Sequence, residues 1–331
     1  MDRSVTSAAS WQAPRAFPLT YPGAAPAHPY LLVDDEVVPM VVAVVDGELR
    51  ATLPDGRDVD EVLVGAGLAP MAERVPVVAY GANRNPHTLA LKMDHHGGRA
   101  DPDAPVAVPV LVVELAEVDV VVGGLSGQGY LFADLAPSPG TTVTAALTLL
   151  DATQAGAVHR SEGVGSGAYD VASLPGVAVV GTDAVVDALA YVGGRPVVVS
   201  PVTGTPLAFA RLAAEGRTFP ALDQPALLAH LLEATGALGP VADALDLPAD
   251  PPAEVAAALA RALNRRWWAR RAGSATDGDP GRALREALDA HRRSVSSSAR
   301  AADGGHRLAV DEVMASGPAL RLGARTRTAG A

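Results

Sequence analysis

V-P-V-V-A-Y-G-A-N-R-N, residues 75–85, is the stretch that decides the fold. Its first part, Val75–Tyr80, is apolar and rich in valine, which predicts a buried strand. Gly81 breaks this strand, and Asn85 followed by Pro86 is typical of a helix N-cap and a first helical residue. A strand, a tight turn and a helix start gather backbone N–H groups at one point, which favours an anion. An ordinary strand-to-helix connection would use the same residues, so this stretch alone leaves both interpretations open.

The composition narrows the class of protein. The chain has 331 residues, 49% of them hydrophobic, which is enough for a sizeable core and suggests two domains. There is no cysteine, which excludes disulfides, thiolate catalysis and cysteine-ligated metals. The net charge is −11, although residues 261–331 carry 14 arginines against 7 acidic residues. Because the rest of the chain is strongly acidic, nucleic acid is not expected as a partner.

The start of the chain gives little sign of structure. Residues 1–29 contain scattered Ala, Pro and Ser without a basic segment or a continuous apolar run, so we expect a flexible tail and no signal peptide. No stretch approaches the ~18 apolar residues that a membrane-spanning helix needs. The default expectation is a cytoplasmic protein.

The middle of the chain alternates apolar runs with turn signals. Asp46-Gly47 and Ser138-Pro139-Gly140 each lie between two β-like runs and each predict a hairpin. The predicted strands of this part are Pro39–Val45, Glu48–Leu53, Val75–Tyr80, Val106–Val122 (as one strand or two), Tyr130–Ala136 and Thr142–Leu149.

A second informative stretch is S-E-G-V-G-S-G-A-Y, residues 161–169. It follows a short predicted helix that is capped by Asp151 and ends at Arg160. Three glycines in five positions place Glu162 on a tight turn with exposed backbone. Taken alone, Glu162 could equally be a solvated turn carboxylate.

The pattern becomes helical and Ala-rich after residue 207, with a change of composition near Pro220. We therefore expect an α+β domain over 30–220 and a helical Ala/Arg-rich region over 221–331 with a partly disordered end. Within it, N-R-R-W-W-A-R-R places Trp267-Trp268 among four arginines. These residues suit contact with a phosphate, a nucleic acid or a protein partner, and they also suit a helix that docks its tryptophans on the core.

Two further motifs are weaker. His95-His96 lies beside Asp94, but no second histidine motif follows at a metal-ligand spacing, so no metal is expected. G-G-L-S-G-Q-G, residues 123–129, lacks the Lys-Ser/Thr that completes a P-loop. No cofactor is therefore expected.

Together the two glycine-containing stretches resemble the γ-glutamylcyclotransferase-like family. The signature of that family is a strand ending in Tyr-Gly-Ser/Thr-Asn/Leu, then, tens of residues later, a short helix and Glu-Gly before a tyrosine. Here the first element is Tyr80-Gly81-Ala82-Asn83, and the second is Glu162-Gly163 with Tyr169. The resemblance covers roughly residues 75–232. Position 82 carries Ala where the family often has Ser or Thr, and His159 stands where an aspartate is common.

The resemblance implies an α+β fold, a small mixed β-barrel or curled sheet, with an added helical C-terminal region. It implies that the α-amine of a γ-glutamyl compound attacks its own γ-carbonyl, giving 5-oxoproline and a free amine. Such a reaction needs an acid/base but no enzyme nucleophile. The implied base is Glu162, and the implied substrate-binding residues are Tyr80, Gly81, Ala82, Asn83 and Tyr169.

A different class of function stays open. The same fold could serve as a non-catalytic module that binds a small molecule, with the C-terminal helices as a surface for a protein partner. Retention of Glu162 favours the enzyme. Ala82, which lacks the hydroxyl, and the large C-terminal addition favour divergence. The amine half of the substrate is not readable from the sequence.

Overall fold

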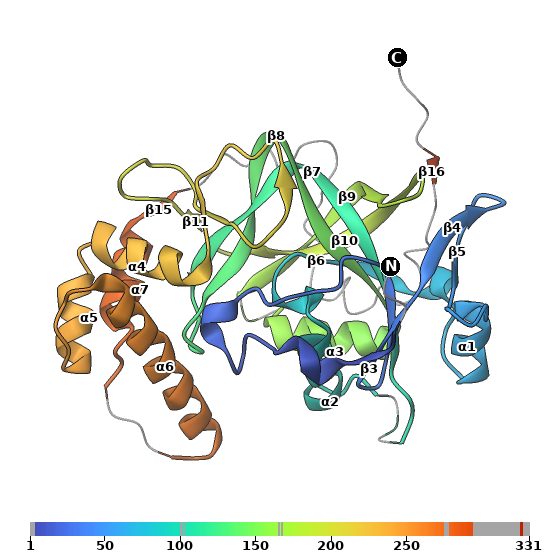
Figure 1. The fold of residues 1–331 in the computed structure, drawn as a ribbon, viewed down its shortest axis with the longest axis horizontal. Coiled ribbons are helices and arrows are strands. Elements are labelled where there is room, and N and C mark those ends of the chain that lie inside the picture. Colours follow the sequence, from blue (N-terminus) through green and yellow to red (C-terminus); the bar gives the residue numbers. More distant parts are fainter. Residues whose placement is uncertain are drawn as a thin grey trace.

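The computed structural model describes residues 4–99, 101, 103–164, 166, 168–274, 278–293 and 325–326. Five strands at its centre close into a mixed barrel (Figure 1). They are β6 (Val75–Ala79), β7 (Ala107–Leu125), β8 (Leu131–Leu150), β9 (Tyr169–Val179) and β10 (Ala184–Gly193). Their order is β7-β9-β10-β6-β8, and pairing of β8 with β7 closes the barrel. Only β6 and β10 run parallel within it. The expected α+β class is confirmed.

The central strand β6 is buried on both faces, which explains its uninterrupted apolar run. One face packs on α2 (Pro86–His95) and α3 (Ala152–Glu162), and the other belongs to the core cluster that fills the barrel. The first face carries Val75, Val77 and Ala79, and the second carries Val78, followed by Tyr80 just past the strand. The predicted cap of α2 is confirmed, because Thr88 N donates to Asn85 Oδ1 over 2.9 Å.

The hairpin predicted at Ser138-Pro139-Gly140 is wrong. These residues lie inside the continuous strand β8, where residues 138–141 face only Glu117 of β7. Gly140 adopts φ +76°, and its N–H donates to Glu117 Oε1 over 3.3 Å. Residues 138–141 therefore form an irregular bulge, which uses the same left-handed glycine as a turn but leaves the strand direction unchanged. The chain reverses instead at Ser126–Tyr130, where Ser126 N donates to Tyr130 O.

The N-terminal segment, expected as a flexible tail, lies against the barrel over its described residues 4–29. Ala8, Ala13 and Tyr21 are buried. The Tyr21 ring stacks on Tyr130 with ring centroids 4.7 Å apart. The segment lacks a regular hydrophobic period because it contains little regular structure: β1 (Thr6–Ser7) and two short 3-10 turns. Its burial depends on isolated residues at irregular spacing, which an analysis of hydrophobic periodicity does not detect.

A small group of elements extends the fold on one side of the barrel (Figure 1, blue). β2 (Tyr30–Val33) pairs with β7, and β3 (Glu36–Pro39) pairs with β2. β4 (Val41–Val45) and β5 (Glu48–Thr52) form the hairpin that Asp46-Gly47 predicts. α1 (Val59–Gly65) follows this hairpin.

Four helices lie on the opposite side of the barrel (Figure 1, orange). They are α4 (Gln224–Ala234), α5 (Leu238–Leu245), α6 (Pro252–Arg271) and α7 (Arg282–Ala290). Their buried leucines belong to the same core cluster as the barrel interior. The remaining short strands are β11 (Val197–Val198), β12 (Ala208–Phe209), β13 (Ala214–Glu215), β14 (Ala221–Leu222), β15 (Arg292–Arg293) and β16 (Arg325–Thr326).

Two expectations concern the rest of the chain. The end expected to be partly disordered, residues 294–331, lies outside the described residues except for 325–326. Among the helices that the structure describes, none combines the length and apolar character needed to cross a membrane.

Candidate functional site

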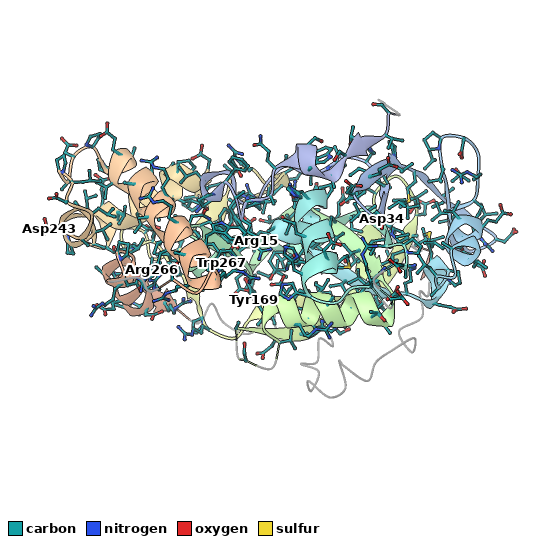
Figure 2. The ribbon with its side chains drawn as sticks, turned by 90° about the horizontal axis from the view of Figure 1, so that it is seen from below. Arg15, Asp34, Tyr169, Asp243, Arg266 and Trp267 are labelled. Carbon is teal, nitrogen blue, oxygen red and sulfur yellow. The ribbon has the colours of Figure 1, made fainter. Side chains whose placement is uncertain are left out.

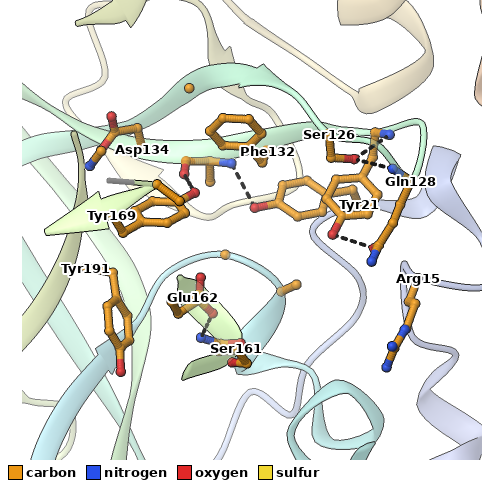
Figure 3. A pocket seen from close by; sticks show the side chains of 18 of the residues that line it. Arg15, Tyr21, Ser126, Gln128, Phe132, Asp134, Ser161, Glu162, Tyr169 and Tyr191 are labelled. Carbon is orange, nitrogen blue, oxygen red and sulfur yellow. Dashed lines mark hydrogen bonds between the residues drawn. The ribbon is translucent and has the colours of Figure 1, made fainter. Parts of the chain in front are cut away.

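A cavity of about 740 Å³ opens beside the loop that follows β6. Its wall is formed by that loop, the end of α3, and parts of β7, β8, β9 and β10 (Figure 3). The sequence-predicted site residues all line this cavity: Tyr80, Gly81, Ala82, Asn83, Glu162 and Tyr169. A volume of this size suits a small organic ligand.

Glu162, at the C-terminal end of α3, lies beside the loop at the wall of the cavity (Figure 3). Asn83 Nδ2 donates to Glu162 Oε1 over 2.8 Å. The Lys92 ammonium, from α2, donates to the same oxygen and forms an ion pair with Glu162. The Glu162 and Lys92 side chains are only 17% and 15% exposed. Neither the Glu162 Oε2 atom nor the buried Asn83 Oδ1 atom has a hydrogen-bond partner among the described residues.

The loop itself is held in close contact with Tyr21. A Cβ atom on Gly81 would lie 2.7 Å from the Tyr21 hydroxyl oxygen, so a larger residue there would displace the Tyr21 ring or the loop. The same hydroxyl accepts a hydrogen bond from Ala133 N over 2.8 Å. Tyr21 thus connects the N-terminal segment, the loop and β8, and fixes the position of the loop against the cavity.

Tyrosines dominate the wall of the cavity. Five of the six tyrosines in the sequence line it, although aromatic residues make up only 4% of the chain. Tyr169 is one of the implied substrate-binding residues, and its hydroxyl donates to the Ala133 carbonyl over 2.8 Å. The Tyr80 hydroxyl donates to the Tyr191 carbonyl. Burial raises the pKa of Tyr80 and Tyr169 well above the ordinary range, so both are neutral hydroxyl donors.

His159, the position that departs from the family pattern, lies behind this wall. It is buried, and its Nδ1 atom is 2.6 Å from the Tyr191 hydroxyl. Burial lowers the pKa of His159 to about 4, with the Glu162 charge opposing that shift. His159 is therefore neutral at pH 7 and positions Tyr191 on the cavity wall.

No sequence pattern predicts three of the residues that line the cavity. Lys92 stands out in the sequence only as the single lysine of an arginine-rich chain. Tyr21 lies in the segment that was expected to be a loose tail. Arg15 comes from the same segment and lines the cavity together with Trp267 of α6. Each of them reaches the site through tertiary packing, which no local pattern reports.

The described residues contain no group of three or more His, Asp or Glu side chains arranged to bind a metal ion. His95 and His96 therefore belong to no such group among the described residues. The His96 carbonyl accepts a hydrogen bond from Arg160 Nη2 over 2.6 Å.

Comparison with known proteins yields little. No family model and no curated protein matches the chain. One similar solved structure is an uncharacterized protein from Homo sapiens, with 22% identity over 37% of this chain and 67% of that one and a TM-score of 0.28. Another is described as gamma-glutamyl cyclotransferase, with 20% identity over 36% of this chain and 66% of that one and a TM-score of 0.28. At these TM-scores the similarity carries no functional argument, so the cavity itself must supply one.

Proposed function

We propose that the chain is a γ-glutamylcyclotransferase-like enzyme, which converts a γ-glutamyl amide into 5-oxoproline and a free amine. One observation carries this proposal: Asn83 and Glu162, 79 residues apart in the sequence, meet in a single cavity with Asn83 Nδ2 2.8 Å from Glu162 Oε1. An ordinary strand-to-helix connection needs neither the carboxylate nor the cavity.

The proposed reaction is an intramolecular transfer. The substrate's α-ammonium loses a proton to Glu162, and the amine nitrogen then attacks the γ-carbonyl carbon. The new C–N bond closes the five-membered ring, and the original amide C–N bond breaks. The α-nitrogen gives up two protons in all, and the departing nitrogen gains two and leaves as an ammonium. Holding both reacting groups in one folded substrate supplies much of the rate enhancement.

Three features of the cavity support these roles. Glu162 Oε2 is left for the substrate, because Asn83 and Lys92 both donate to Oε1. The buried Asn83 Oδ1 atom has no hydrogen-bond partner among the described residues, which suits an N–H group of the substrate's ammonium. The Gly81 amide lies at the start of a short 3-10 turn that lines the cavity, where a carboxylate or a developing oxyanion is favoured.

A second candidate is a non-catalytic module that binds a small molecule in the same cavity. The ion pair of Lys92 with Glu162 favours it, because a neighbouring ammonium already neutralises the charge of the carboxylate. Ala82 also favours the non-catalytic module, because its side chain lacks the hydroxyl that Ser or Thr would offer to a substrate.

The test is release of 5-oxoproline from a panel of γ-glutamyl amides by the wild type and by Glu162→Gln. We expect release by the wild type and a fall in kcat of roughly 10²-fold or more in the variant, as for loss of a general acid/base. Glu61→Gln, an exposed glutamate on α1, is the matched control and should leave the rate unchanged.

Two results would reject the enzyme. One is absence of release from every panel member, and the other is equal release by wild type and Glu162→Gln. Binding of 5-oxoproline without any turnover would support the non-catalytic module.

A further inference from the structure

The cavity extends beyond Glu162 to a group of residues supplied by the N-terminal segment and by α6. Arg15 comes from the N-terminal segment, and Trp267 and Arg271 come from the last turns of α6. The Arg15 and Arg271 Cζ atoms lie 4.9 Å and 5.0 Å from the centroid of the Trp267 ring. Figure 2 shows Arg15 and Trp267 side by side, and Figure 3 shows Arg15 at the far side of the cavity from Tyr191.

The position of Arg15 is fixed by α6. Asn264 Nδ2 donates to the Arg15 carbonyl over 2.8 Å and to the Gln128 carbonyl over 3.2 Å. Gln128 belongs to the turn between β7 and β8. This one amide therefore ties the N-terminal segment and the barrel turn to the helix that carries Trp267 and Arg271.

Neither Arg15 nor Arg271 forms an ion pair with any residue that the structure describes. The Arg15 Nε atom is buried and has no hydrogen-bond partner there either. Burial lowers the pKa of Arg15, and the positive charge of Arg271 lowers it further. Two like charges are thus held together around one ring without a counter-ion from the described part of the chain.

The carboxylates that line the cavity are all engaged elsewhere. Glu162 pairs with Lys92, and Asp289 pairs with Arg292. Asp134 accepts hydrogen bonds from Gly193 N and Leu135 N, both over 2.8 Å. The charge around Trp267 is therefore left for a ligand to neutralise.

We propose that Arg15, Trp267 and Arg271 form a subsite for a dianionic group, a phosphate monoester, on the amine half of the substrate. This assignment rests on the proposed function, which places the γ-glutamyl half at Glu162. A cavity of about 740 Å³ has room for more than that half. Two guanidinium groups match a phosphate monoester in charge, about −1.5 to −2 at pH 7, and offer it paired N–H donors.

Binding is tested without turnover by calorimetry with O-phosphoethanolamine. The proteins are the wild type, Arg15→Gln, Arg271→Gln and a control, Arg265→Gln, which changes an exposed arginine of the same helix that does not line the cavity. We expect Arg15→Gln and Arg271→Gln each to weaken binding on the order of tenfold or more, and the control to leave it unchanged. Absence of binding by the wild type, or equal binding by all four proteins, would overturn the subsite.

Turnover distinguishes the chemistry of the anion. Release of 5-oxoproline is compared for γ-glutamyl-phosphoethanolamine, γ-glutamyl-β-alanine and γ-glutamyl-ethanolamine, which carry a phosphate, a carboxylate and no charge. We expect kcat/KM to be highest for the phosphate compound, with that preference lost in Arg15→Gln. A preference for the carboxylate compound, or equal rates for all three, would overturn the assignment of a dianion.

The two proposals can fail separately. Binding of O-phosphoethanolamine that depends on Arg15, without 5-oxoproline from any compound, would keep the subsite and reject the cyclotransferase. Release from the uncharged compound as fast as from the phosphate compound, without binding of O-phosphoethanolamine, would keep the cyclotransferase and reject the subsite.

Discussion

At the scale of single residues, the candidate site is organised by hydrogen bonds that hold its side chains in fixed positions. Glu162 Oε1 accepts from both Asn83 and Lys92, and this holds the carboxylate at the cavity wall. Behind the wall, the His159 imidazole contacts the Tyr191 hydroxyl in a buried pair. A buried neutral histidine makes the stability of the fold depend on pH, because the unfolded chain lets that histidine take up a proton more readily.

The His159 pair predicts a specific loss of stability in acid. The pKa of His159 is about 4 in the folded protein and ~6.5 in an unfolded chain. As pH falls from ~6.5 to ~4, His159 takes up a proton in the unfolded state but stays neutral in the folded state. The free energy of unfolding should fall by on the order of 3 kcal/mol across that window. Urea unfolding of the wild type and of His159→Gln at pH 4 to 7 measures this free energy. The free energy of unfolding of the variant should depend less steeply on pH. Parallel plots of that free energy against pH for the two proteins would refute the assignment.

At the scale of elements, the position of α6 depends on one close backbone approach. A Cβ atom on Gly129 would lie 2.3 Å from the Ala260 carbonyl oxygen, and Gly129 also adopts φ +91°. The turn between β7 and β8 therefore packs directly on the helix backbone. This contact brings Trp267 and Arg271 to the cavity, along with the Asn264 hydrogen bonds.

A pair of glycine substitutions tests this contact. Gly129→Ala introduces both left-handed strain and a clash with α6. Gly140→Ala introduces strain alone, since no atom of the described residues lies within 4 Å of its Cβ position. We expect Gly140→Ala to cost about 1–2 kcal/mol of folding stability and Gly129→Ala about 1–3 kcal/mol more. Urea denaturation of both variants measures the difference. Equal costs would show that α6 does not pack as described.

The elements also show what sequence reasoning can and cannot reach. β6, the Asn85 cap of α2 and the Asp46-Gly47 turn follow from local chemistry, and each is present in the structure. The Ser138-Pro139-Gly140 signal failed because a bulge and a reversing turn need the same backbone conformation at glycine. The ion pair of Lys92 with Glu162 could not be predicted from the sequence, since it joins residues 70 positions apart through the packing of α2 beside α3.

At the scale of the whole molecule, the helical region and the barrel share one hydrophobic core. Leu227, Leu231, Leu259 and Leu284 of the helices belong to the same buried cluster as the barrel interior. The boundary expected near residue 220 separates two compositions, but the core is continuous across it. The two parts should therefore unfold together.

Unfolding followed by two signals tests that continuity. In a Trp11→Phe variant, tryptophan fluorescence comes only from Trp267 and Trp268 of α6, because the chain has three tryptophans. Far-UV circular dichroism reports on the barrel and the helices together. We expect the two transitions to have the same urea midpoint, as a cooperative unit requires. A fluorescence transition that precedes the dichroism change would show that α6 unfolds independently.

The central claim, an intramolecular attack at the cavity that contains Glu162, is tested most directly by the isotopic composition of the product. The wild type is incubated with a γ-glutamyl amide in H₂¹⁸O, and the acidic product is analysed by mass spectrometry. Ring closure adds no water, so the account predicts unlabelled 5-oxoproline, formed by the wild type and not by Glu162→Gln. Glutamate carrying one ¹⁸O atom would show hydrolysis and contradict it.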